Sequence, residues 1–230
     1  MKVVFVGPSL PDASDHIPDD IISRAPAMQG DIMQAVSEGA KLIGLIDGQF
    51  EFVAPVWHKE ILFALSKGVT VLGSASMGAL RAAECATFGM TGIGKIYEEY
   101  ASGLRWDDAD VALLYGPPEL NYPPISLPMV NVDATLKKAT DLALISKDQQ
   151  TAISLAAREV FFKDRTWKKI AEVAKLERSI MDEIVKYAYV DQKRTDALTL
   201  LKAMQTERKH PQNEAGWTFN ATPIWRAMYS

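Results

Sequence analysis

The sequence has few of the residues from which disulfide frameworks, zinc sites and membrane spans are built. Its 230 residues include one cysteine, Cys85, which excludes an internal disulfide and fits a reducing compartment. The three histidines, His16, His58 and His210, are scattered without zinc-site spacing, so we expect neither a metal nor a cofactor. No apolar run approaches the ~20 residues that a membrane span needs.

A targeting segment and a strongly basic charge are also absent. The apolar run at residues 3–6 is too short for a signal peptide and is typical of a first strand, so we expect a cytoplasmic protein. Residues 1–130 hold 8 Lys and Arg against 16 Asp and Glu, and residues 131–230 hold 17 against 13. This balance argues against nucleic acid as a partner and suits either a protein partner or a solvated helical surface.

Hydrophobic patterning in the first 90 residues alternates between buried strands and amphipathic helices. Stretches made up mainly of apolar residues at 3–6, 41–46 and 69–72 predict central parallel strands. Three-residue and four-residue apolar spacing predicts a helix after each strand. This order predicts an α/β fold, with a small parallel three-layer unit in a catalytic domain at residues 1–130.

The segment after residue 90 gives weaker signals. Its glycines follow a helix and not a strand, so they do not form a dinucleotide fingerprint. A short helix is expected at residues 96–100, a strand at 111–114 and an edge strand near 128–132. The acidic run at residues 107–110 resembles a metal cluster, but a solvated turn is the expected structure because no glutamate follows at calcium-loop spacing.

From residue 131 the pattern becomes helical. About five short amphipathic segments predict a helical domain at residues 131–230. Helix N-caps are expected at Asp133, Asp148, Thr166 and Asp191. The last 20 residues are too aromatic for simple disorder, and we expect their rings to dock on the protein itself or on a partner.

Residues 69–84 hold the strongest functional signal. The run Ser74-Ala75-Ser76-Met77-Gly78 lies between a predicted strand and a predicted helix, close to the small-x-Ser-x-Gly pattern of a nucleophile elbow. In such an elbow the amide of Met77 and the helix N-terminus face an anion formed beside Ser76. Serines also cap helices very often, so the spacing alone leaves both roles open.

Other chemical groups are expected at the same edge of the sheet. Ser9 and Asp47 follow predicted strands, and the helix that begins near His58 and Lys59 starts at the same edge. Asp47-Gly48 is also an ordinary turn pair. Lys59 can activate a serine only when burial keeps it neutral, and an exposed lysine paired with an acid is the alternative.

The chain resembles the TfuA-like family over residues 1 to about 115. The resemblance is carried by these motifs: Gly7-Pro8-Ser9-Leu10, Arg24-Ala25-Pro26-Ala27, Gly30-Asp31, Asp47-Gly48-Gln49-Phe50, Val56-Trp57-His58-Lys59-Glu60-Ile61, Ser76 to Glu84, and Asp107 to Ala112. It implies partnership with a YcaO enzyme in peptide backbone thioamidation, a step in the biosynthesis of ribosomal peptide natural products.

The resemblance also implies a hydrolase that releases sulfide from a thiocarboxylated, ThiS-like sulfur carrier through a Ser-Lys pair. On this sequence the pair is Ser76 as the nucleophile and Lys59 as the base. Oxyanion and orienting roles then fall to Met77, Ser9, His58 and Asp47, and carrier or partner contacts fall to Arg81, Glu84 and Arg24.

Two alternatives to sulfide release follow from the same residues. One is a non-catalytic adaptor that brings the precursor peptide to the YcaO enzyme. The other is a stand-alone esterase or peptidase with the same pair of residues. His58 is a second candidate for the base, and a contact with the precursor peptide stays open.

Overall fold

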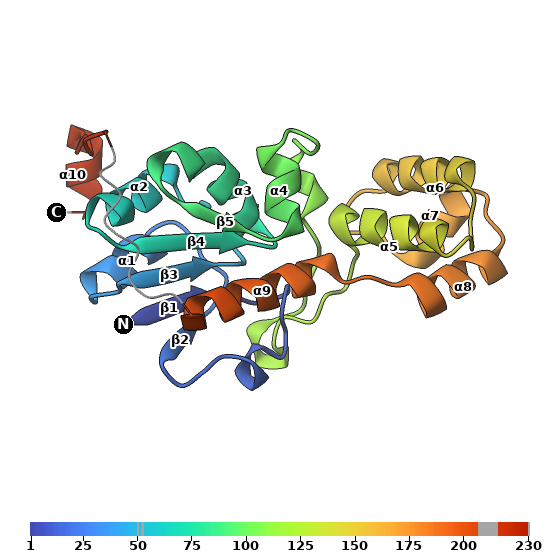
Figure 1. Ribbon diagram of the computed structural model, residues 1–230, viewed down its shortest axis with the longest axis horizontal. Coiled ribbons are helices and arrows are strands. Elements are labelled where there is room, and N and C mark those ends of the chain that lie inside the picture. Colours follow the sequence, from blue (N-terminus) through green and yellow to red (C-terminus); the bar gives the residue numbers. More distant parts are fainter. Residues whose placement is uncertain (50, 52, 207–215, 230) are drawn as a thin grey trace.

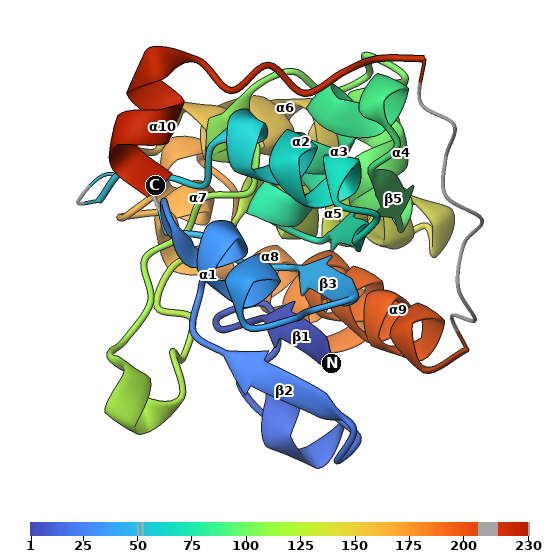
Figure 2. The same cartoon turned by 90° about the vertical axis from the view of Figure 1, so that its left-hand side faces the viewer.

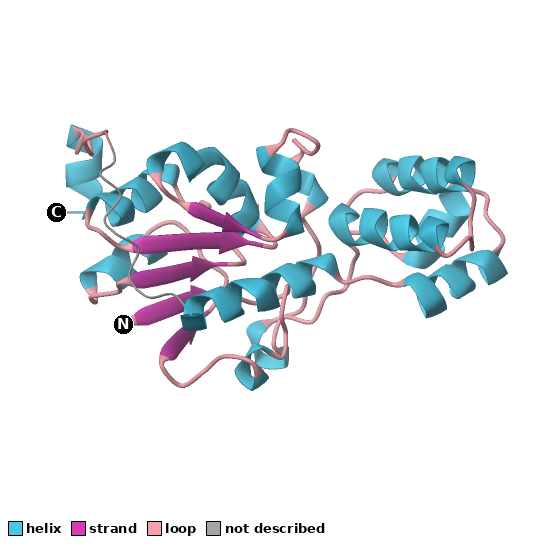
Figure 3. Cartoon of the chain, in the orientation of Figure 1, coloured by secondary structure: helices cyan, strands magenta, loops and turns pink. Residues whose placement is uncertain are grey.

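The computed structural model of the chain describes residues 1–49, 51, 53–206 and 216–229 (Figure 1). Within that part, five parallel strands form one sheet in the order β2-β1-β3-β4-β5. The strand arrows point toward a separate group of helices, so the carboxyl edge of the sheet faces that group (Figure 3). The strands are β1 (Lys2–Phe5), β2 (Ile21–Arg24), β3 (Leu42–Leu45), β4 (Thr70–Ser74) and β5 (Thr91–Ile93).

The three central strands agree with the sequence prediction, and the two edge strands were not predicted. β1, β3 and β4 carry the three continuous apolar runs. β2 is exposed at Ile22 and Ser23, and β5 contains Gly92, so neither edge strand presents an apolar run. Edge strands need less apolar sequence because water reaches one of their sides.

Helices cover both faces of the sheet. One face packs against α1 (Asp31–Ser37), α2 (His58–Ser66) and α3 (Met77–Cys85). The other face packs against α9 (Gln192–Thr206), which crosses the sheet in Figure 1. The resulting three layers confirm the predicted α/β class, and Cys85 is buried as expected of a small core residue.

The helices beyond the carboxyl edge form a bundle with its own core. It consists of α5 (Met129–Asp141), α6 (Lys147–Glu159), α7 (Trp167–Val173) and α8 (Arg178–Ala188). The chain then returns to the sheet as α9. The predicted helical region is therefore divided between the bundle, the cover of the sheet and the C-terminal tail.

Several boundaries differ from the sequence prediction. The stretch expected as a strand at 111–114 is irregular, and the edge strand expected near 128–132 is wrong because α5 begins at Met129. Asp133 lies inside α5, and the hydroxyl of Ser146, not Asp148, caps α6. The predicted cap at Thr166 is confirmed by its bond from the amide of Lys169, at 3.2 Å.

Short helical segments complete the chain. α4 (Lys95–Ala101) confirms the short helix predicted at residues 96–100, and it packs beside β5. Among the described residues, no helix is long and apolar enough to cross a membrane. The remaining segments are single 3-10 turns at Ala13–Asp15, Ala86–Phe88, Asp108–Asp110 and Pro118–Leu120.

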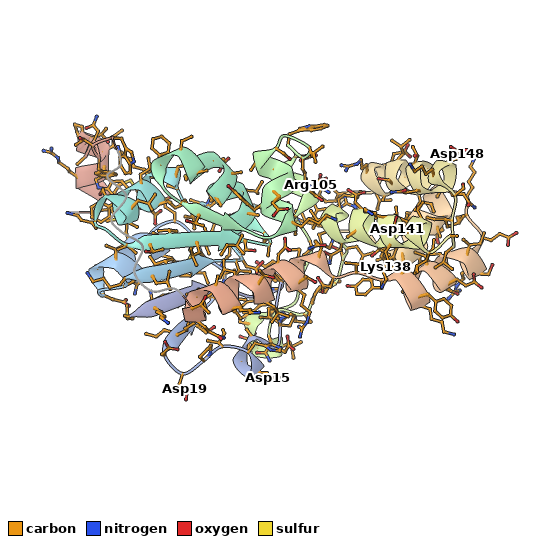
Figure 4. The ribbon with its side chains drawn as sticks, in the orientation of Figure 1. Asp15, Asp19, Arg105, Lys138, Asp141 and Asp148 are labelled. Atoms are coloured by element: carbon orange, nitrogen blue, oxygen red, sulfur yellow. The ribbon has the colours of Figure 1, made fainter. Side chains whose placement is uncertain are left out.

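A network of ion pairs joins the sheet unit to the bundle. Arg105, labelled in Figure 4, binds the carboxylates of Asp110 and Asp133, the latter at 3.1 Å. Arg158 of α6 binds the same two carboxylates at 2.9 and 3.2 Å. Asp110 is buried, so the acidic run predicted to be a solvated turn is in fact partly an interior ion-pair site.

The described part of the C-terminal tail docks on the protein itself. It includes α10 (Pro223–Tyr229) and runs across the outer side of α2 and α3 (Figure 2). The rings of Phe219 and Trp225 lie 5.4 and 5.5 Å from that of Phe63 in α2. The expectation that the tail buries aromatic rings is confirmed at Trp225.

Two glycines set how closely α3 approaches the sheet. A Cβ at Gly78 would lie 1.7 Å from the carbonyl oxygen of Leu45, and one at Gly73 would lie 2.2 Å from that of Gly78. Both contacts involve backbone atoms, which can shift only at a high cost in free energy. The glycines are therefore needed because the first turn of α3 lies directly on β3 and β4.

We predict that Gly78→Ala destabilises the protein although alanine favours helices by about 1 kcal/mol over glycine. Overpacking costs about 1–3 kcal/mol or more, and the clash with backbone exceeds the gain in propensity. Urea unfolding should show a loss of about 2 kcal/mol or more. Gly216→Ala is the control, because nothing lies within 4 Å of a Cβ there, and equal midpoints for the two variants would contradict the prediction.

Candidate active site

The turn between β4 and α3 has a strained backbone. Ala75 has a φ of 62°, and the amide of Ser76 donates to the carbonyl oxygen of Ser74 at 2.7 Å. This bond across one residue with positive φ is the rarer and more strained form of γ-turn. Strain of this kind is found mainly at functional sites, where the surrounding structure enforces it. The turn therefore has the character expected of an elbow.

Ser76 stands directly before α3, but its hydroxyl does not cap the helix. In the described part of the chain, neither its Oγ nor the amide of Met77 has a hydrogen-bond partner. The next amide, that of Gly78, donates to the carbonyl oxygen of Ile46 at 3.2 Å. A hydroxyl and a helix-terminal amide are thus available side by side, as covalent attack on a carbonyl carbon requires.

The neighbouring serine of the turn has a structural role. The Oγ of Ser74 donates to the carbonyl oxygens of Ile93 and Asp196, at 2.7 and 3.0 Å. These bonds tie the elbow to β5 and to α9. Ser74 therefore shapes the turn, and Ser76 is the serine left for chemistry.

Asp47 and Ser9 meet at the carboxyl edge of the sheet, as predicted. Asp47 is 1% exposed, and it accepts bonds from the amides of Gly7 and Ser9 at 2.9 and 3.0 Å and from the Ser9 hydroxyl at 2.6 Å. Both donors of Ser9 are thus directed at Asp47. This arrangement makes Ser9 a partner of the carboxylate and not the second oxyanion donor that the sequence suggested.

The Asp47 turn and the elbow are in contact. β3 and β4 pair with Leu45 opposite Gly73, so Asp47 and Ser76 follow neighbouring strand ends. A Cβ at Gly48 would lie 2.1 Å from the Sδ of Met77, which shows how closely the two turns pack. The elbow and the turn that holds Asp47 therefore pack directly against each other.

A lysine that the sequence did not indicate lies beside the Asp47 carboxylate. Lys193, near the start of α9, is 2% exposed. Its Nζ donates to the carbonyl oxygen of Val111 at 3.0 Å and lies 3.9 Å from Oδ1 of Asp47. One helical turn later, the carbonyl oxygen of Asp196 accepts the bond from Ser74. α9 thus joins the elbow and the lysine.

Burial changes the acidity of this lysine. Removal from water lowers the pKa of Lys193, and the carboxylates of Asp47 and Asp191 offset only part of that effect. One feature of the sequence indicates that Lys193 is buried. Lys193 occupies a place in the apolar stripe of α9, with Ala197, Leu200 and Met204, where a lysine is unexpected.

Lys59, the base suggested by the sequence, has a different environment. Its Nζ donates to the hydroxyl of Thr222 in the tail at 3.0 Å. It also lies 5.8 Å from the ring centres of Phe219 and Trp225. Among the contacts of the described residues, none joins Lys59 or Lys193 directly to Ser76.

The remaining predicted residues form two surface groups. The Nε2 of His58 and an Nη1–H of Arg81 both lie 2.7 Å from Oε2 of Glu84, which links α2 to α3. Arg24 forms a separate ion pair with Glu38. The structure thus brings His58, Arg81 and Glu84 together, and among the described residues none of the three forms a hydrogen bond or ion pair with Ser76.

A proline-rich hairpin covers another side of the site. Tyr115 pairs with Pro124 in an antiparallel bridge, and the rings of Tyr115 and Tyr122 lie 6.0 Å apart. Burial first, and then the charge of Asp47, raise the pKa of Tyr115. A Cβ at Gly7 would lie 3.3 Å from the ring of Tyr122, so the hairpin packs on the loop whose amides bind Asp47.

Comparison with known families identifies the family of the chain. Residues 47–166 match the sequence model of the family described as TfuA-like protein. The chain belongs to the TfuA-like family. No curated protein matches the sequence.

The family match covers part of the candidate site of this TfuA-like protein. Asp47, Lys59 and the elbow with Ser76 lie inside the matched residues. Ser9 and Lys193 lie outside them. The assignment of Lys193 to the site therefore depends on its contacts with Asp47 and Val111 and not on the family.

We predict that the stability difference between wild type and Lys193→Met depends on pH. Folding lowers the pKa of Lys193, so the unfolded chain binds more protons between the two pKa values. The free energy of unfolding of the wild type, relative to Lys193→Met, should rise with pH and level off above about 10.4, the usual pKa of lysine.

Urea unfolding from about pH 7 to about pH 10.5 measures this difference across the usual pKa of lysine. The control is Lys138→Met, because Lys138 is exposed on α5 (Figure 4) and its variant should differ from wild type by a constant amount. A difference that is equally flat for Lys193→Met would contradict the prediction.

Proposed function

We propose that this TfuA-like protein releases sulfide from a thiocarboxylated, ubiquitin-like carrier of the ThiS type, with Ser76 as the nucleophile. The strained turn at Ala75, which leaves the Ser76 hydroxyl and the Met77 amide without partners in the described chain, is the observation that supports it. A carrier tail that ends in a thiocarboxylate presents the carbonyl carbon that such a serine attacks.

The proposed reaction has two steps. In the first, Ser76 Oγ bonds to the thiocarboxylate carbon, its proton passes to a neutral lysine, and the amide of Met77 donates to the oxyanion. The carbon–sulfur bond breaks as the lysine passes its proton to the departing sulfur, so hydrosulfide leaves, the lysine is neutral again, and the carrier is held as an ester of Ser76. In the second, water attacks the ester with the lysine as base, which frees the carrier carboxylate and restores the serine.

We assign the base to Lys193 and not to Lys59. A lysine accepts a proton only when neutral, and burial favours the neutral form of Lys193. Lys193 also lies beside Asp47 at the edge from which the elbow rises, whereas Lys59 is bound by the tail. Asp47 then holds the protonated lysine formed during the reaction.

The sulfide has a consumer within the same proposal. TfuA-like proteins are associated with YcaO enzymes, which use ATP to activate a peptide-bond oxygen so that sulfur can replace it. We propose that this chain supplies the sulfur for backbone thioamidation of a ribosomal peptide. Hydrolysis close to the YcaO enzyme would limit the loss of free sulfide.

Ser76→Ala should lower sulfide release from a thiocarboxylated carrier by about three orders of magnitude or more, because the nucleophile is lost. Sulfide trapping under single-turnover conditions measures it. Ser74→Ala is the matched control in the same turn, and it should lose stability but keep release. Release that survives in Ser76→Ala would remove the hydrolase proposal, and continued YcaO binding by that variant would then favour an adaptor.

Lys193→Met should lower sulfide release by about 10²–10⁴-fold, the usual contribution of a general base. Lys59→Met should reduce it less than tenfold. In the wild type, the rate of sulfide release should rise with pH as the lysine loses its proton. The rate in Lys193→Met should not show this rise. A larger loss of sulfide release in Lys59→Met than in Lys193→Met would instead assign the base to Lys59.

A further inference from the structure

The residue after Lys193 is a second cation, and it binds a carboxylate of its own. Arg194 holds Asp12 in a fork: its Nη1 bonds to Oδ1, and its Nη2 donates to Oδ2 at 2.7 Å. The Nε2 of His16 lies 3.1 Å from Oδ2 of Asp12 and 3.2 Å from Nη2 of Arg194. A fork of two bonds fixes the orientation of both partners. The bond from Arg194 holds the pKa of Asp12 well below its usual range, so the pair stays charged at the pH values where lysines titrate.

The loop that carries Asp12 is the loop that binds Asp47. The amide and the hydroxyl of Ser9 donate to Asp47 at 3.0 and 2.6 Å. Between Ser9 and Asp12 the chain turns tightly, and the amide of Ala13 donates to the carbonyl oxygen of Leu10 at 3.0 Å. Leu10 and Ala13 are buried in one apolar cluster with residues of α9. The position of Asp12 relative to Asp47 is therefore fixed by the loop itself.

These contacts form a closed ring around the buried lysine. Its members, in order, are Asp47, Ser9, Asp12, Arg194 and Lys193. The ring closes because Nζ of Lys193 lies 3.9 Å from Oδ1 of Asp47. Asp47, Ser9 and Lys193 are 2% exposed or less, whereas the side chains of Arg194 and Asp12 are 35% and 39% exposed. The ion pair is thus the most exposed link of the ring.

The acidity of Lys193 depends on this enclosure. Burial is the main cause of its lowered pKa, and the carboxylates of Asp47 and Asp191 act against burial. On the side of the bundle, Oδ1 of Asn131 accepts a hydrogen bond from the amide of Lys193 at 3.1 Å. If the loop separated from α9, water would reach the amine, and the pKa would return toward about 10.4, the usual value of lysine.

We propose that Arg194 and Asp12 are positioning residues for Lys193, an inference that rests on the role of Lys193 as the base proposed above. Their ion pair holds the loop after β1 against the start of α9, which keeps water from the amine and keeps the amine beside Asp47. Both residues act through Lys193 and not on the thiocarboxylate. An exposed ion pair contributes little to global stability, so variants that lack it should fold.

The test is the acidity of Lys193, followed by NMR on the full chain with isotope-labelled lysine side chains. The signal of Lys193 is the one that is missing in Lys193→Met. In the wild type this signal should titrate below about 10.4. Arg194→Met and Asp12→Asn should each raise the midpoint toward that value, because each variant opens the ring.

The two variants separate positioning from a simple effect of charge. Arg194→Met removes a positive charge and Asp12→Asn removes a negative one, so charge alone would move the midpoint of Lys193 in opposite directions. Loss of positioning moves it upward in both. Arg194→Lys keeps the charge and can still donate to Asp12, so it should restore most of the wild-type midpoint. A midpoint that falls in Asp12→Asn, or that stays unchanged in either variant, would overturn the proposal.

Lys137→Met and Asp141→Asn are the matched controls. They break the ion pair between Lys137 and Asp141 on α5, whose charged atoms are 2.7 Å apart, and they remove the same two charges. Both should leave the midpoint of Lys193 at its wild-type value, and an equal rise in these controls would also contradict the assignment.

Sulfide release provides a second measurement. At about pH 8, Arg194→Met and Asp12→Asn should lower kcat by about tenfold and leave KM unchanged, a smaller loss than that of the base itself. An unchanged kcat in both would show that the pair does not serve the reaction. If Ser76→Ala kept full release, the hydrolase proposal would fail, and the NMR midpoint of Lys193 would still decide whether the ion pair positions the lysine.

Discussion

The buried carboxylate of Asp47 is the group on which the arrangement of the site depends. It follows β3, the central strand of the five described, and it accepts three hydrogen bonds from the loop after β1. The Nζ of Lys193 from α9 lies 3.9 Å away. A buried carboxylate without partners would cost several kcal/mol, so these segments are held in place together. Asp47 thus fixes a loop, a strand end and a helix from distant parts of the sequence.

The elbow is strained, and its surroundings hold it. The first turn of α3 lies on β3 at Gly78, and the hydroxyl of Ser74 binds β5 and α9 at once. Each of these contacts resists relaxation of the turn at Ala75. If the Ser76 hydroxyl capped α3, it would accept a hydrogen bond from a helix amide. The hydroxyl would then no longer be available as a nucleophile. The structure instead leaves that hydroxyl without such a bond, which is consistent with the chemistry that we propose.

The sequence predicted the parts of the structure that short-range patterns determine. The central strands carry apolar runs because helices cover both faces of the sheet. The elbow carries small residues because the turn after β3 and the turn after β4 pack closely against each other. The edge strand β2 was not predicted because one of its sides is exposed, so its sequence has no continuous apolar run. The start of α5 was mistaken for a strand because Pro128 suggested an extended edge, while in the structure it precedes the first turn of a helix.

The site was predicted only where its residues follow strands. Ser9, Asp47 and Ser76 share an edge because parallel strands place their carboxyl ends together. Lys193 comes from a helix more than 100 residues after the elbow, and no local pattern connects the two. Its position depends on the tertiary path of the chain, which passes through the bundle before it returns over the sheet.

That path also explains why the base in our proposal is a lysine. α9 covers the face opposite α3, so a side chain from it must extend past the sheet edge to reach the carboxylate after β3. The long lysine side chain makes that reach while its methylene groups stay among apolar residues. The carbonyl oxygen of Val111, one residue after the ion-paired Asp110, then orients the amine. Val111 and Asp47 therefore both act on one nitrogen atom, and in our proposal α9 makes the helical half of the chain part of the site and not an appendage to it.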